Sequence, residues 1–318
     1  MTGTVGRAVA VTAPAKINLC LGVGPAREDG YHALATVYQA IGLYDQVTVT
    51  PAEDLTVTMR ASRQLSVEDV PTDATNIAAR AALLLAEHHG IEPGVAITID
   101  KGIPVAGGMA GGSADGAASL LACDSMWGLR TSRDELLELA AELGSDVPFA
   151  LVGGTAIGSG RGEVVTPLMT RGEYWWVVLE SDVGLSTPSV YREFDLMHQM
   201  HQMHQTHGVS PARPPEISDE LISALRRHDV AALGAHLSND LQQAALRLRP
   251  ELGRGLERGR LESAYGAILS GSGPSCLFLC EGRAHAMQVA GGLRSVGLGP
   301  VSLAPGQVHG ARLVAKEH

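Results

Sequence analysis

The sequence has no long apolar run and few cysteines. No stretch approaches the roughly 18 uninterrupted apolar residues of a membrane helix, and the first twenty residues lack the basic head and apolar run of a secretory signal. The four cysteines form no CxxC pair, which argues against a disulfide framework or a zinc site. We therefore expect no membrane association and a reducing, cytoplasmic location.

An excess of positive charge is also absent. Lysine and arginine number 24 against 34 for aspartate and glutamate, which gives a net charge of −10. So acidic a protein is not expected to bind nucleic acid over a broad surface. With 45% hydrophobic and 18% charged residues, the chain has the composition of a folded protein, which excludes wholesale disorder. Its 318 residues favour two domains.

Glycine, by contrast, is abundant and clustered. Many of the 38 glycines gather at residues 107–113, 153–154, 158–162 and 270–273. Because glycine loses much chain entropy on folding, such clusters indicate backbone that turns sharply or lies close to a ligand.

Residue periodicity predicts strands and helices in mixed order. Alternating or short apolar runs predict strands at 95–99, 175–179 and 276–279, and a pair of strands at 47–50 and 55–58. Helical spacing and capping residues predict helices at 76–89, 114–127 and 132–143. Because these elements follow no strict βαβ rhythm, the fold class that we expect is α+β.

The longest glycine cluster lies between a predicted strand and a predicted helix. Main-chain N–H groups of such a loop, together with the positive end of the helix, attract a phosphate without any lysine. The loop has no Gly-Lys-Ser/Thr of a Walker A motif, and its glycines do not follow the GxGxxG order. We interpret it as a phosphate-binding loop; the alternative is a flexible turn beside an alanine-rich helix.

Four motifs, in order along the chain, resemble one family. Pro104–Ala114 resembles the ATP loop of the GHMP kinases, the superfamily of galactokinase, homoserine kinase and mevalonate kinase. Pro14–Leu19 with Arg27–His32 resembles the opening of one member, Gly144–Phe149 its catalytic aspartate segment, and Ile268–Pro274 the third superfamily motif. The likeness therefore extends over nearly the whole chain.

The resemblance implies a two-domain GHMP kinase fold with ligands in the cleft between the domains. Residues 1–168 are expected to form an ATP-binding N-terminal domain like the second domain of ribosomal protein S5. Residues 169–318 are expected to form a ferredoxin-like domain on the substrate side.

The sequence departs from the family pattern at a few places. Ala106 and Ala110 stand where members often carry glycine, and Met109 stands where leucine is usual. These changes are expected to restrict the conformational freedom of the loop backbone without abolishing it.

The Met-His-Gln repeat at 197–205 has no counterpart in the family. We interpret it as a surface spacer, with adventitious metal binding as the alternative, because histidines three apart drift about 60° per step around a helix.

The resemblance also implies an ATP-dependent kinase that uses Mg²⁺. It places Asp146 beside the acceptor hydroxyl as candidate general base, and Lys16 near both Asp146 and the γ-phosphate. A neighbouring lysine weakens a carboxylate as a base, so Asp146 either deprotonates the hydroxyl or orients it. The alternative for Asp146 is a helix N-cap, since Pro148 stands in the first turn. The alternative for Lys16 is a solvated surface lysine.

The substrate that the resemblance implies is a small molecule, a methylerythritol linked to cytidine diphosphate and phosphorylated on its 2-hydroxyl in the non-mevalonate isoprenoid pathway. Tyr31 and Tyr191 would stack on the two faces of the cytosine, and His32 would bind the base edge. Asn18 would lie at the sugar-like acceptor, and Thr187 in the segment that carries Tyr191. For Tyr31 and His32 the alternative is an ordinary turn.

On the ATP side, the resemblance implies that the loop faces the phosphates. The residues expected to bind ATP are Asn76, Lys101, Pro104, Ala106, Gly107, Gly108, Met109, Ala110, Gly111, Gly112 and Ser113. Asn76 is either a contact to the adenine or a plain helix N-cap, and Lys101 is either near the nucleotide or a solvated strand end. No carboxylate cluster marks a metal site, so ATP and water are expected to supply most Mg²⁺ ligands.

Three other functions remain open from the sequence. They are a GHMP kinase for another alcohol such as homoserine or mevalonate, a dinucleotide-dependent oxidoreductase, and a non-catalytic nucleotide-binding regulator. Both a monomer and a homodimer are compatible with the sequence.

Overall fold

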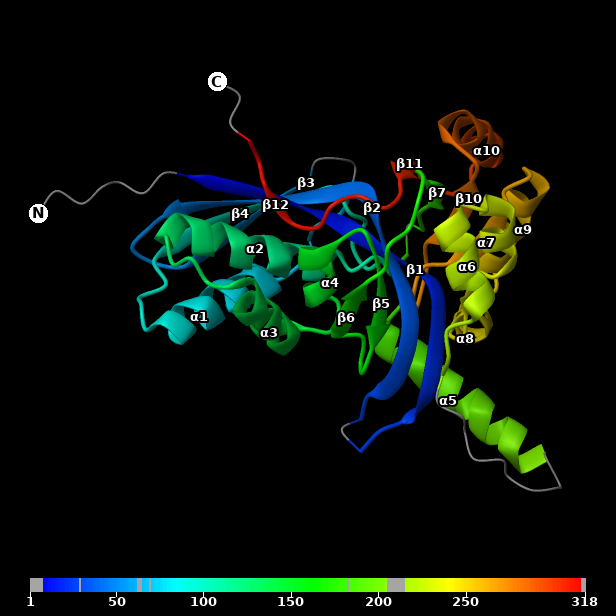
Figure 1. The fold of residues 1–318 in the computed structure, drawn as a ribbon, viewed down its shortest axis with the longest axis horizontal. Helices are drawn as coiled ribbons and strands as arrows, with labels where there is room; N and C mark the ends of the chain where they lie inside the picture. Colours follow the sequence, from blue (N-terminus) through cyan, green and yellow to red (C-terminus); the bar gives the residue numbers. More distant parts are fainter. Residues whose placement is uncertain are drawn as a thin grey trace, which may run out of the picture.

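The computed structural model describes residues 8–28, 30–61, 65–68, 70–181, 183–204 and 215–315. Two β-sheets with helices packed against them form the molecule (Figure 1), which confirms the α+β class. The first sheet contains β1 (Val9–Ala26), β2 (His32–Pro51), β3 (Thr56–Ala61), β4 (Val95–Lys101), β5 (Thr155–Ser159), β6 (Val164–Pro167), β8 (Ser238–Asn239) and β12 (Arg312–Leu313).

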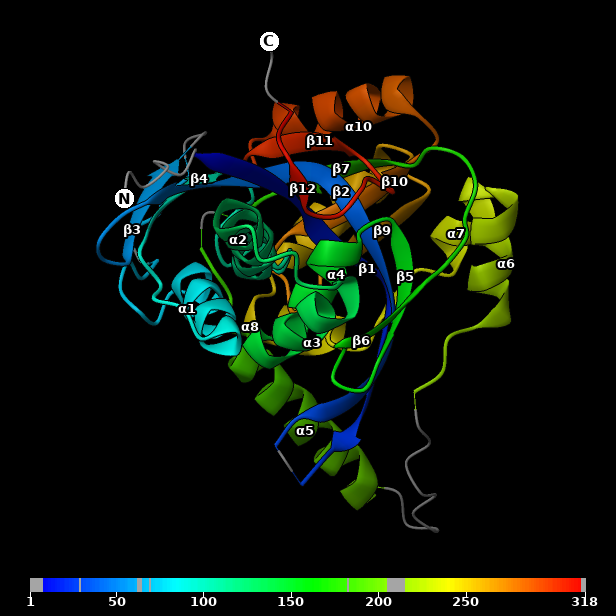
Figure 2. The same ribbon diagram turned by 60° about the vertical axis from the view of Figure 1, so that its left-hand side comes forward.

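Four helices pack together beside the first sheet, as Figure 2 shows. They are α1 (Ile77–His89), α2 (Gly111–Trp127), α3 (Arg133–Leu143) and α4 (Val147–Val152). On β4 the buried and half-buried residues alternate, because successive side chains point to opposite faces of a sheet. Ile97 and Ile99 thus enter the same core as the alanines of α2. The predicted helices at 76–89, 114–127 and 132–143 and the strand at 95–99 are confirmed.

The prediction that 47–50 and 55–58 form a strand pair is wrong. Both segments are strands, but β4 lies between them, and β3 pairs with β4 in parallel. The chain passes from β3 through α1 before it enters β4. Such a helical crossover joins parallel neighbours, whereas a short break joins antiparallel ones.

The second sheet is antiparallel and has the order β11-β7-β10-β9. Its strands are β7 (Trp175–Leu179), β9 (Gly266–Leu269), β10 (Cys276–Cys280) and β11 (Val301–Pro305). Its helices are α5 (Thr187–His204), α6 (Asp219–Arg227), α7 (Val230–Ala235), α8 (Gln242–Leu248), α9 (Leu252–Leu261) and α10 (Arg283–Val296). Helices separate the first strand from the second and the third from the fourth, which is the ferredoxin-like arrangement expected for this half of the chain.

The end of the chain returns to the first sheet. Strand β12 pairs with β1, and single bridges join Gly306 to Ile41 and His309 to Gly153. The short strand β8 also pairs with β1. The boundary at residue 168 stays a prediction, but segments that follow it complete the sheet that precedes it.

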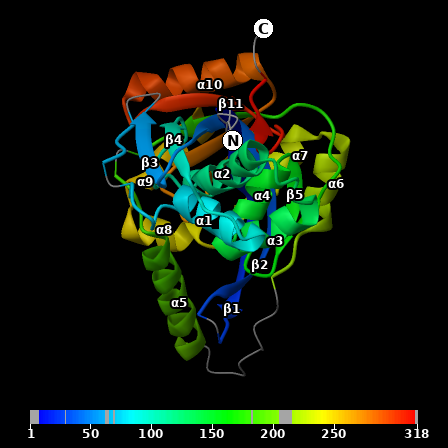
Figure 3. The same cartoon turned by 90° about the vertical axis from the view of Figure 1, so that its left-hand side faces the viewer.

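Helix α5 projects from the body of the molecule. Figure 3 shows it extending on the same side as the far end of the β1–β2 hairpin. A hydrogen bond between His32 and Asp195 joins the two elements. The Met-His-Gln repeat, predicted as a spacer, continues this helix as far as His204; Gln205 lies outside the described residues.

Candidate active site

A cavity of about 740 Å³ opens between the two halves of the protein. Its walls come from β1, the loop before α2, the start of α4, the start of α5 and the turn between β9 and β10. The cavity has the volume of a typical small-molecule site. The glycine loop and the segments predicted to hold the substrate therefore border one space.

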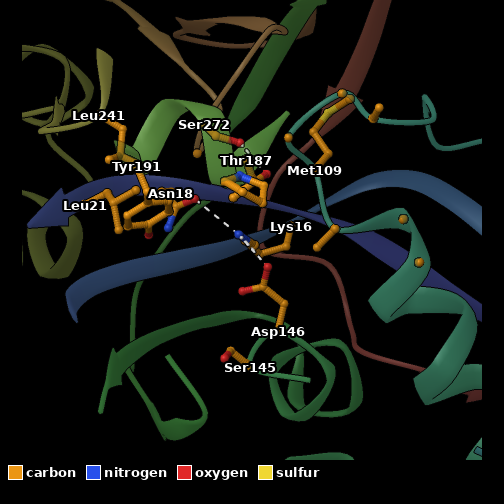
Figure 4. Close-up of a pocket in the computed structure, with 18 of the residues that line it drawn as sticks. Lys16, Asn18, Leu21, Met109, Ser145, Asp146, Thr187, Tyr191, Leu241 and Ser272 are labelled. Atoms are coloured by element: carbon orange, nitrogen blue, oxygen red, sulfur yellow. Dashed lines mark hydrogen bonds and ion pairs between the residues drawn. The ribbon is translucent and has the colours of Figure 1, made fainter. Parts of the chain in front are cut away.

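Lys16 and Asp146 face each other in this cavity (Figure 4). The Lys16 Nζ atom lies 3.1 Å from the Asp146 carboxylate and donates a hydrogen bond of 3.3 Å to Asn18 Oδ1. It also lies 5.2 Å from the centre of the Tyr38 ring. Lys16 is only 7% exposed, so the alternative of a solvated surface lysine is wrong.

The amide nitrogen of Asn18 is hydrogen-bonded on the side of the residue that faces away from Lys16. Its Nδ2 donates to Thr36 Oγ1 at 2.8 Å, and Thr36 in turn donates to the carbonyl of Cys20 at 2.6 Å. Because the amide nitrogen is engaged, the amide oxygen is the atom that faces Lys16. The buried strand pair β1–β2 thus holds the three polar side chains in a definite order.

Asp146 occupies the N-cap position of α4, with Pro148 in the first turn, yet its side chain makes no capping hydrogen bond. The carboxylate pairs with Lys16 instead. Burial, with the negative charge of Asp146 as a further cause, raises the pKa of Tyr38 well above its usual value. The same two causes raise the pKa of Tyr191 to about 12. Both phenols therefore keep their protons at neutral pH.

The glycine loop is tied to both halves of the protein. The Met109 carbonyl accepts a hydrogen bond of 3.0 Å from the Lys16 amide, and the Gly108 carbonyl accepts one of 2.9 Å from Ser270 Oγ. Helix α2 then begins at Gly111, and its N-cap Ala110 provides no side-chain acceptor for the first amides. Unpaired amides at a helix N-terminus are suited to bind an anion.

Two loop residues adopt a conformation that favours glycine. Ala106 has a φ of 53° and Ala110 a φ of 57°. These are the two positions at which the family often carries glycine. The left-handed conformation costs a residue with a side chain about 1–2 kcal/mol, so the alanines add strain to this loop.

Not every residue predicted to bind ATP borders the cavity. Pro104 and the residues from Ala106 to Gly112 do, but Ser113 does not. Met109 is 1% exposed and belongs to a hydrophobic core that residues of both halves of the chain form. Asn76 lies at the start of α1, where its side chain accepts from the Ala78 amide and donates to the carbonyl of Pro71. The capping alternative is therefore realised for Asn76, and an adenine contact stays a prediction.

Lys101 is buried beneath the loop, so the alternative of a solvated strand end is wrong. Its ammonium pairs with Asp45 and, at 2.7 Å, with Asp115 on helix α2. Asp45 also accepts the backbone amides of Gly102 and Ile103. Burial lowers the pKa of Lys101, but the carboxylates of Asp115 and Asp45 outweigh it, and the pKa is raised. This network joins the end of β4, which precedes the loop, to α2, which follows it.

All five residues predicted to bind the substrate also border the cavity: Asn18, Tyr31, His32, Thr187 and Tyr191. His32 Nε2 lies 2.9 Å from Asp195 Oδ1, and the His32 ring is 4.9 Å from the Tyr191 ring. Tyr31 is 53% exposed, and the guanidinium of Arg161 lies 5.0 Å from its ring centre. Tyr31 therefore borders the opening, while Tyr191 and His32 lie inside.

The residues of this site include three that sequence reasoning missed. Asp195, Arg161 and Ser272 all border the cavity. Ser272 Oγ lies 2.8 Å from Thr187 Oγ1, which joins the start of α5 to the turn before β10. Arg161 and Ser272 stand within two of the glycine clusters, so the clusters could have indicated them. Asp195 had no such signal.

No group of three His, Cys, Asp or Glu side chains that could hold a metal ion occurs among the described residues. Within the repeat, His198 packs on Phe194 of the preceding turn and forms a hydrogen bond of 3.1 Å with its carbonyl oxygen. In the part of the chain that the structure describes, no helix is both long and apolar enough to cross a membrane.

Two family models match the chain. Residues 76–154 match the GHMP kinases N terminal domain, and residues 221–297 match the GHMP kinases C terminal domain. A homoserine kinase from Cytophaga hutchinsonii has the same fold, with a TM-score of 0.73 at 17% identity over 99% of both chains. The fold and the site thus define a kinase of the GHMP class, and the expected two-domain GHMP kinase fold is confirmed.

Relatives that align with nearly the whole chain identify one family within the GHMP kinases. The chain is 54% identical to a 4-diphosphocytidyl-2-C-methyl-D-erythritol kinase of a Nocardioides species, over 95% of this chain and 99% of the relative. It is 50% identical to that of Thermobifida fusca, over 96% and 98%. A crystal structure of a 4-(cytidine 5'-diphospho)-2C-methyl-D-erythritol kinase matches with a TM-score of 0.73 at 32% identity, over 94% of this chain and 99% of that one. The chain belongs to the 4-diphosphocytidyl-2-C-methyl-D-erythritol kinase family.

Proposed function

We propose that the protein transfers the γ-phosphoryl group of ATP to the 2-hydroxyl of 4-diphosphocytidyl-2-C-methyl-D-erythritol, giving the 2-phosphate and ADP. This reaction is a step of the non-mevalonate route to isoprenoid precursors. Relatives that cover nearly the whole chain are named for this kinase activity. The structural observation that carries the proposal is the Lys16–Asp146 pair, 3.1 Å apart in a cavity that the glycine loop also borders.

Phosphoryl transfer passes through a loose transition state, so placement and electrostatics provide most of the catalysis. In the proposed mechanism, the first amides of α2 bind the triphosphate, and the Lys16 ammonium stabilises negative charge on the γ-phosphoryl oxygens. The Asp146 carboxylate accepts the hydrogen bond of the acceptor hydroxyl. The hydroxyl oxygen forms a bond to phosphorus, the bond to the ADP oxygen breaks, and the proton leaves in the direction of Asp146.

Asp146 has two possible roles within this mechanism. As a general base it takes the proton in the transition state; as an orienting group it only aims the hydroxyl. A general base makes kcat depend on its own ionisation and on the acidity of the acceptor. A series of acceptors of different acidity therefore distinguishes the roles.

The substrate is proposed to extend from Lys16 toward α5. Asn18, whose amide oxygen faces Lys16, would bind the methylerythritol end. His32 would bind the edge of the cytosine, Tyr191 would cover one of its faces, and Tyr31 would cover the other at the opening. Thr187, at the start of α5, would bind the part between them.

Mg²⁺ is proposed to arrive with ATP. The chain offers no cluster of three ligands within the described residues, which fits an ion held mainly by phosphate oxygens and water. Asp146 borders the cavity beside Lys16, and it would reach such an ion directly or through water. When bound, the ion offsets charge on the β- and γ-phosphates.

The proposal is tested by ADP release with the cytidyl substrate set against homoserine and mevalonate. We expect turnover with the cytidyl substrate alone, and competition by free CDP. Turnover of either other alcohol at a comparable rate would overturn the assignment in favour of another GHMP kinase. A fluorescence titration with NAD checks the oxidoreductase alternative, for which we expect no binding. We further propose that the enzyme acts in the cytoplasm and needs neither nucleic acid nor membrane.

A further inference from the structure

Asp195, a side chain beside the proposed cytosine site, has no role in the proposed phosphoryl transfer. Asp195 lies on α5 and borders the cavity, and its Oδ1 atom is 2.9 Å from Nε2 of His32. The His32 side chain is only 7% exposed, while that of Asp195 is 37% exposed. A nearly buried imidazole is thus held by a carboxylate from an element far away in the sequence.

The aromatic neighbours of His32 restrict the imidazole further. The Tyr191 ring lies 4.9 Å from it at an interplanar angle of 36°, and the Phe194 ring lies 6.2 Å from it at 82°. Tyr191, Phe194 and Asp195 lie within five consecutive residues of α5. The ring contacts and the hydrogen bond to Asp195 together restrict the two side-chain torsions of His32, and with them the positions of its two ring nitrogens.

The carboxylate also determines which nitrogen carries the hydrogen. An ionised carboxylate only accepts hydrogen bonds, so Nε2 must donate. In the neutral ring Nδ1 then carries the lone pair and acts as an acceptor. Within the described part of the chain, no hydrogen bond reaches Nδ1.

We propose that Asp195 is a positioning residue that selects an aminopyrimidine, by holding His32 with its hydrogen on Nε2 and its acceptor Nδ1 toward position 4 of the base. This inference rests on the proposed function, because it assigns the discrimination between bases within the same site. Cytosine has an amino group at position 4, which donates to Nδ1. Uracil has a carbonyl oxygen there, and the two lone pairs repel each other.

The test compares the binding of CDP and UDP by calorimetry in the wild type and in Asp195→Ala. Without the carboxylate, His32 is free to carry its hydrogen on either nitrogen. We expect the affinity for CDP to fall about tenfold, as for the loss of one good hydrogen bond, and the preference for CDP over UDP to fall by a similar factor. Asp195→Glu is expected to restore part of the preference.

The matched control is Glu193→Ala. Glu193 lies on the same helix and pairs with Arg247 at 3.1 Å, and it does not border the cavity. Glu193→Ala removes the same charge from α5 as Asp195→Ala does. We therefore expect the affinity for CDP and the preference for CDP over UDP to stay at the wild-type values. If Glu193→Ala lowers the preference as much as Asp195→Ala does, the effect belongs to the helix and the proposal is overturned.

Nitrogen-15 NMR of His32 provides a readout that a purely structural role would not change. At pH 8 we expect an Nε2–H ring in the wild type and a mixture of the two tautomers in Asp195→Ala. A wild-type ring that is protonated on Nδ1, or on both nitrogens, would overturn the proposal.

Kinetics separate this inference from the proposed function. In Asp195→Ala we expect KM for the cytidyl substrate to rise about tenfold, with kcat and KM for ATP near the wild-type values. If the wild type does not phosphorylate the cytidyl substrate, the proposed function fails. If it does, and Asp195→Ala keeps the full preference for CDP, only the role of Asp195 fails.

Discussion

The Lys16 ammonium and the Asp146 carboxylate lie 3.1 Å apart, although one comes from the first strand and the other from the residue before α4. Lys16 is held by its backbone bond to Met109 and by its contact with Asn18. Asp146 is placed by the start of α4. The protein thus brings a cation and an anion to one point beside the glycine loop before any substrate binds.

Removing either partner should lower kcat strongly and leave the fold intact. In Asp146→Asn we expect kcat to fall roughly 10²–10⁴-fold, because the acceptor hydroxyl loses its proton acceptor. In Lys16→Ala we expect a loss of similar size, because the γ-phosphoryl charge is no longer stabilised. ADP release measures kcat, and circular dichroism checks the fold. Asp134→Asn, exposed on α3, is the control, and wild-type kcat in Asp146→Asn would contradict the assignment.

Ala110→Gly should stabilise the protein. The residue has a φ of 57°, and the left-handed conformation costs alanine about 1–2 kcal/mol. The larger conformational entropy of glycine in the unfolded chain offsets about 0.5–1 kcal/mol of the strain that is relieved. We therefore expect a net increase of about 0.5–1 kcal/mol in the free energy of unfolding. Urea denaturation measures it. Ala117→Gly, inside α2 and fully buried, should have the opposite sign, and a loss of stability in Ala110→Gly would refute the strain.

Gly108→Ala should loosen the contact between the glycine loop and the second domain. Gly108 has a φ of 76°, and a Cβ atom there would lie 2.2 Å from the carbonyl oxygen of Ser270. We expect a loss of about 2–3 kcal/mol in the free energy of unfolding and weaker ATP binding, measured by urea denaturation and calorimetry. At Gly112 the nearest atom, Ile77 Cγ2, is 3.8 Å from such a Cβ. Gly112→Ala should therefore keep wild-type stability, and equal losses in both variants would exclude a steric cause.

Lys101→Met should destabilise the fold by about 3–5 kcal/mol, because it leaves two buried carboxylates without their cation. The pKa of Lys101 is raised above the usual 10.5, so the folded protein holds this proton more tightly than the unfolded chain. The stabilisation is complete below about pH 10.5 and is lost as the pH rises through the folded value. Urea midpoints of the wild type should stay level from pH 8 to 10 and fall between pH 10.5 and 12, and they should change less in the variant. Equal pH dependence in the two would show that Lys101 does not contribute it.

Local patterns were sufficient to predict the elements near the loop. The alternation at 95–99 and the capping box of Ser132 and Glu135 both reappear in the structure. The partners of buried charges could not be predicted. Nothing in the sequence marks Asp45, in the middle of β2, as the ion-pair partner of Lys101 on β4. Such a contact depends on which strands become neighbours. The pairing of β3 with β4 was missed for the same reason.

The site was predictable where one segment carries the chemistry, as in the glycine loop. It was not predictable where segments converge. Asp195 forms a hydrogen bond with His32, and Ser272 with Thr187, yet neither pair has a spacing that sequence alone could reveal. The scarcity of lysine is itself a sequence signal of the site, because the chain has three lysines, Lys16, Lys101 and Lys316. The first two border the cavity.

The return of the chain to strand β1 has a consequence for folding. Val11 and Thr12 pair with Leu313 and Arg312, so this part of the edge of β1 stays uncovered until the segment around residue 312 has folded back. The second domain therefore folds within a loop whose two ends both lie in the first sheet. A variant truncated before residue 306 would keep the residues that line both sides of the cavity but would lose the pairing of β12 with β1 and the bridges to Ile41 and Gly153.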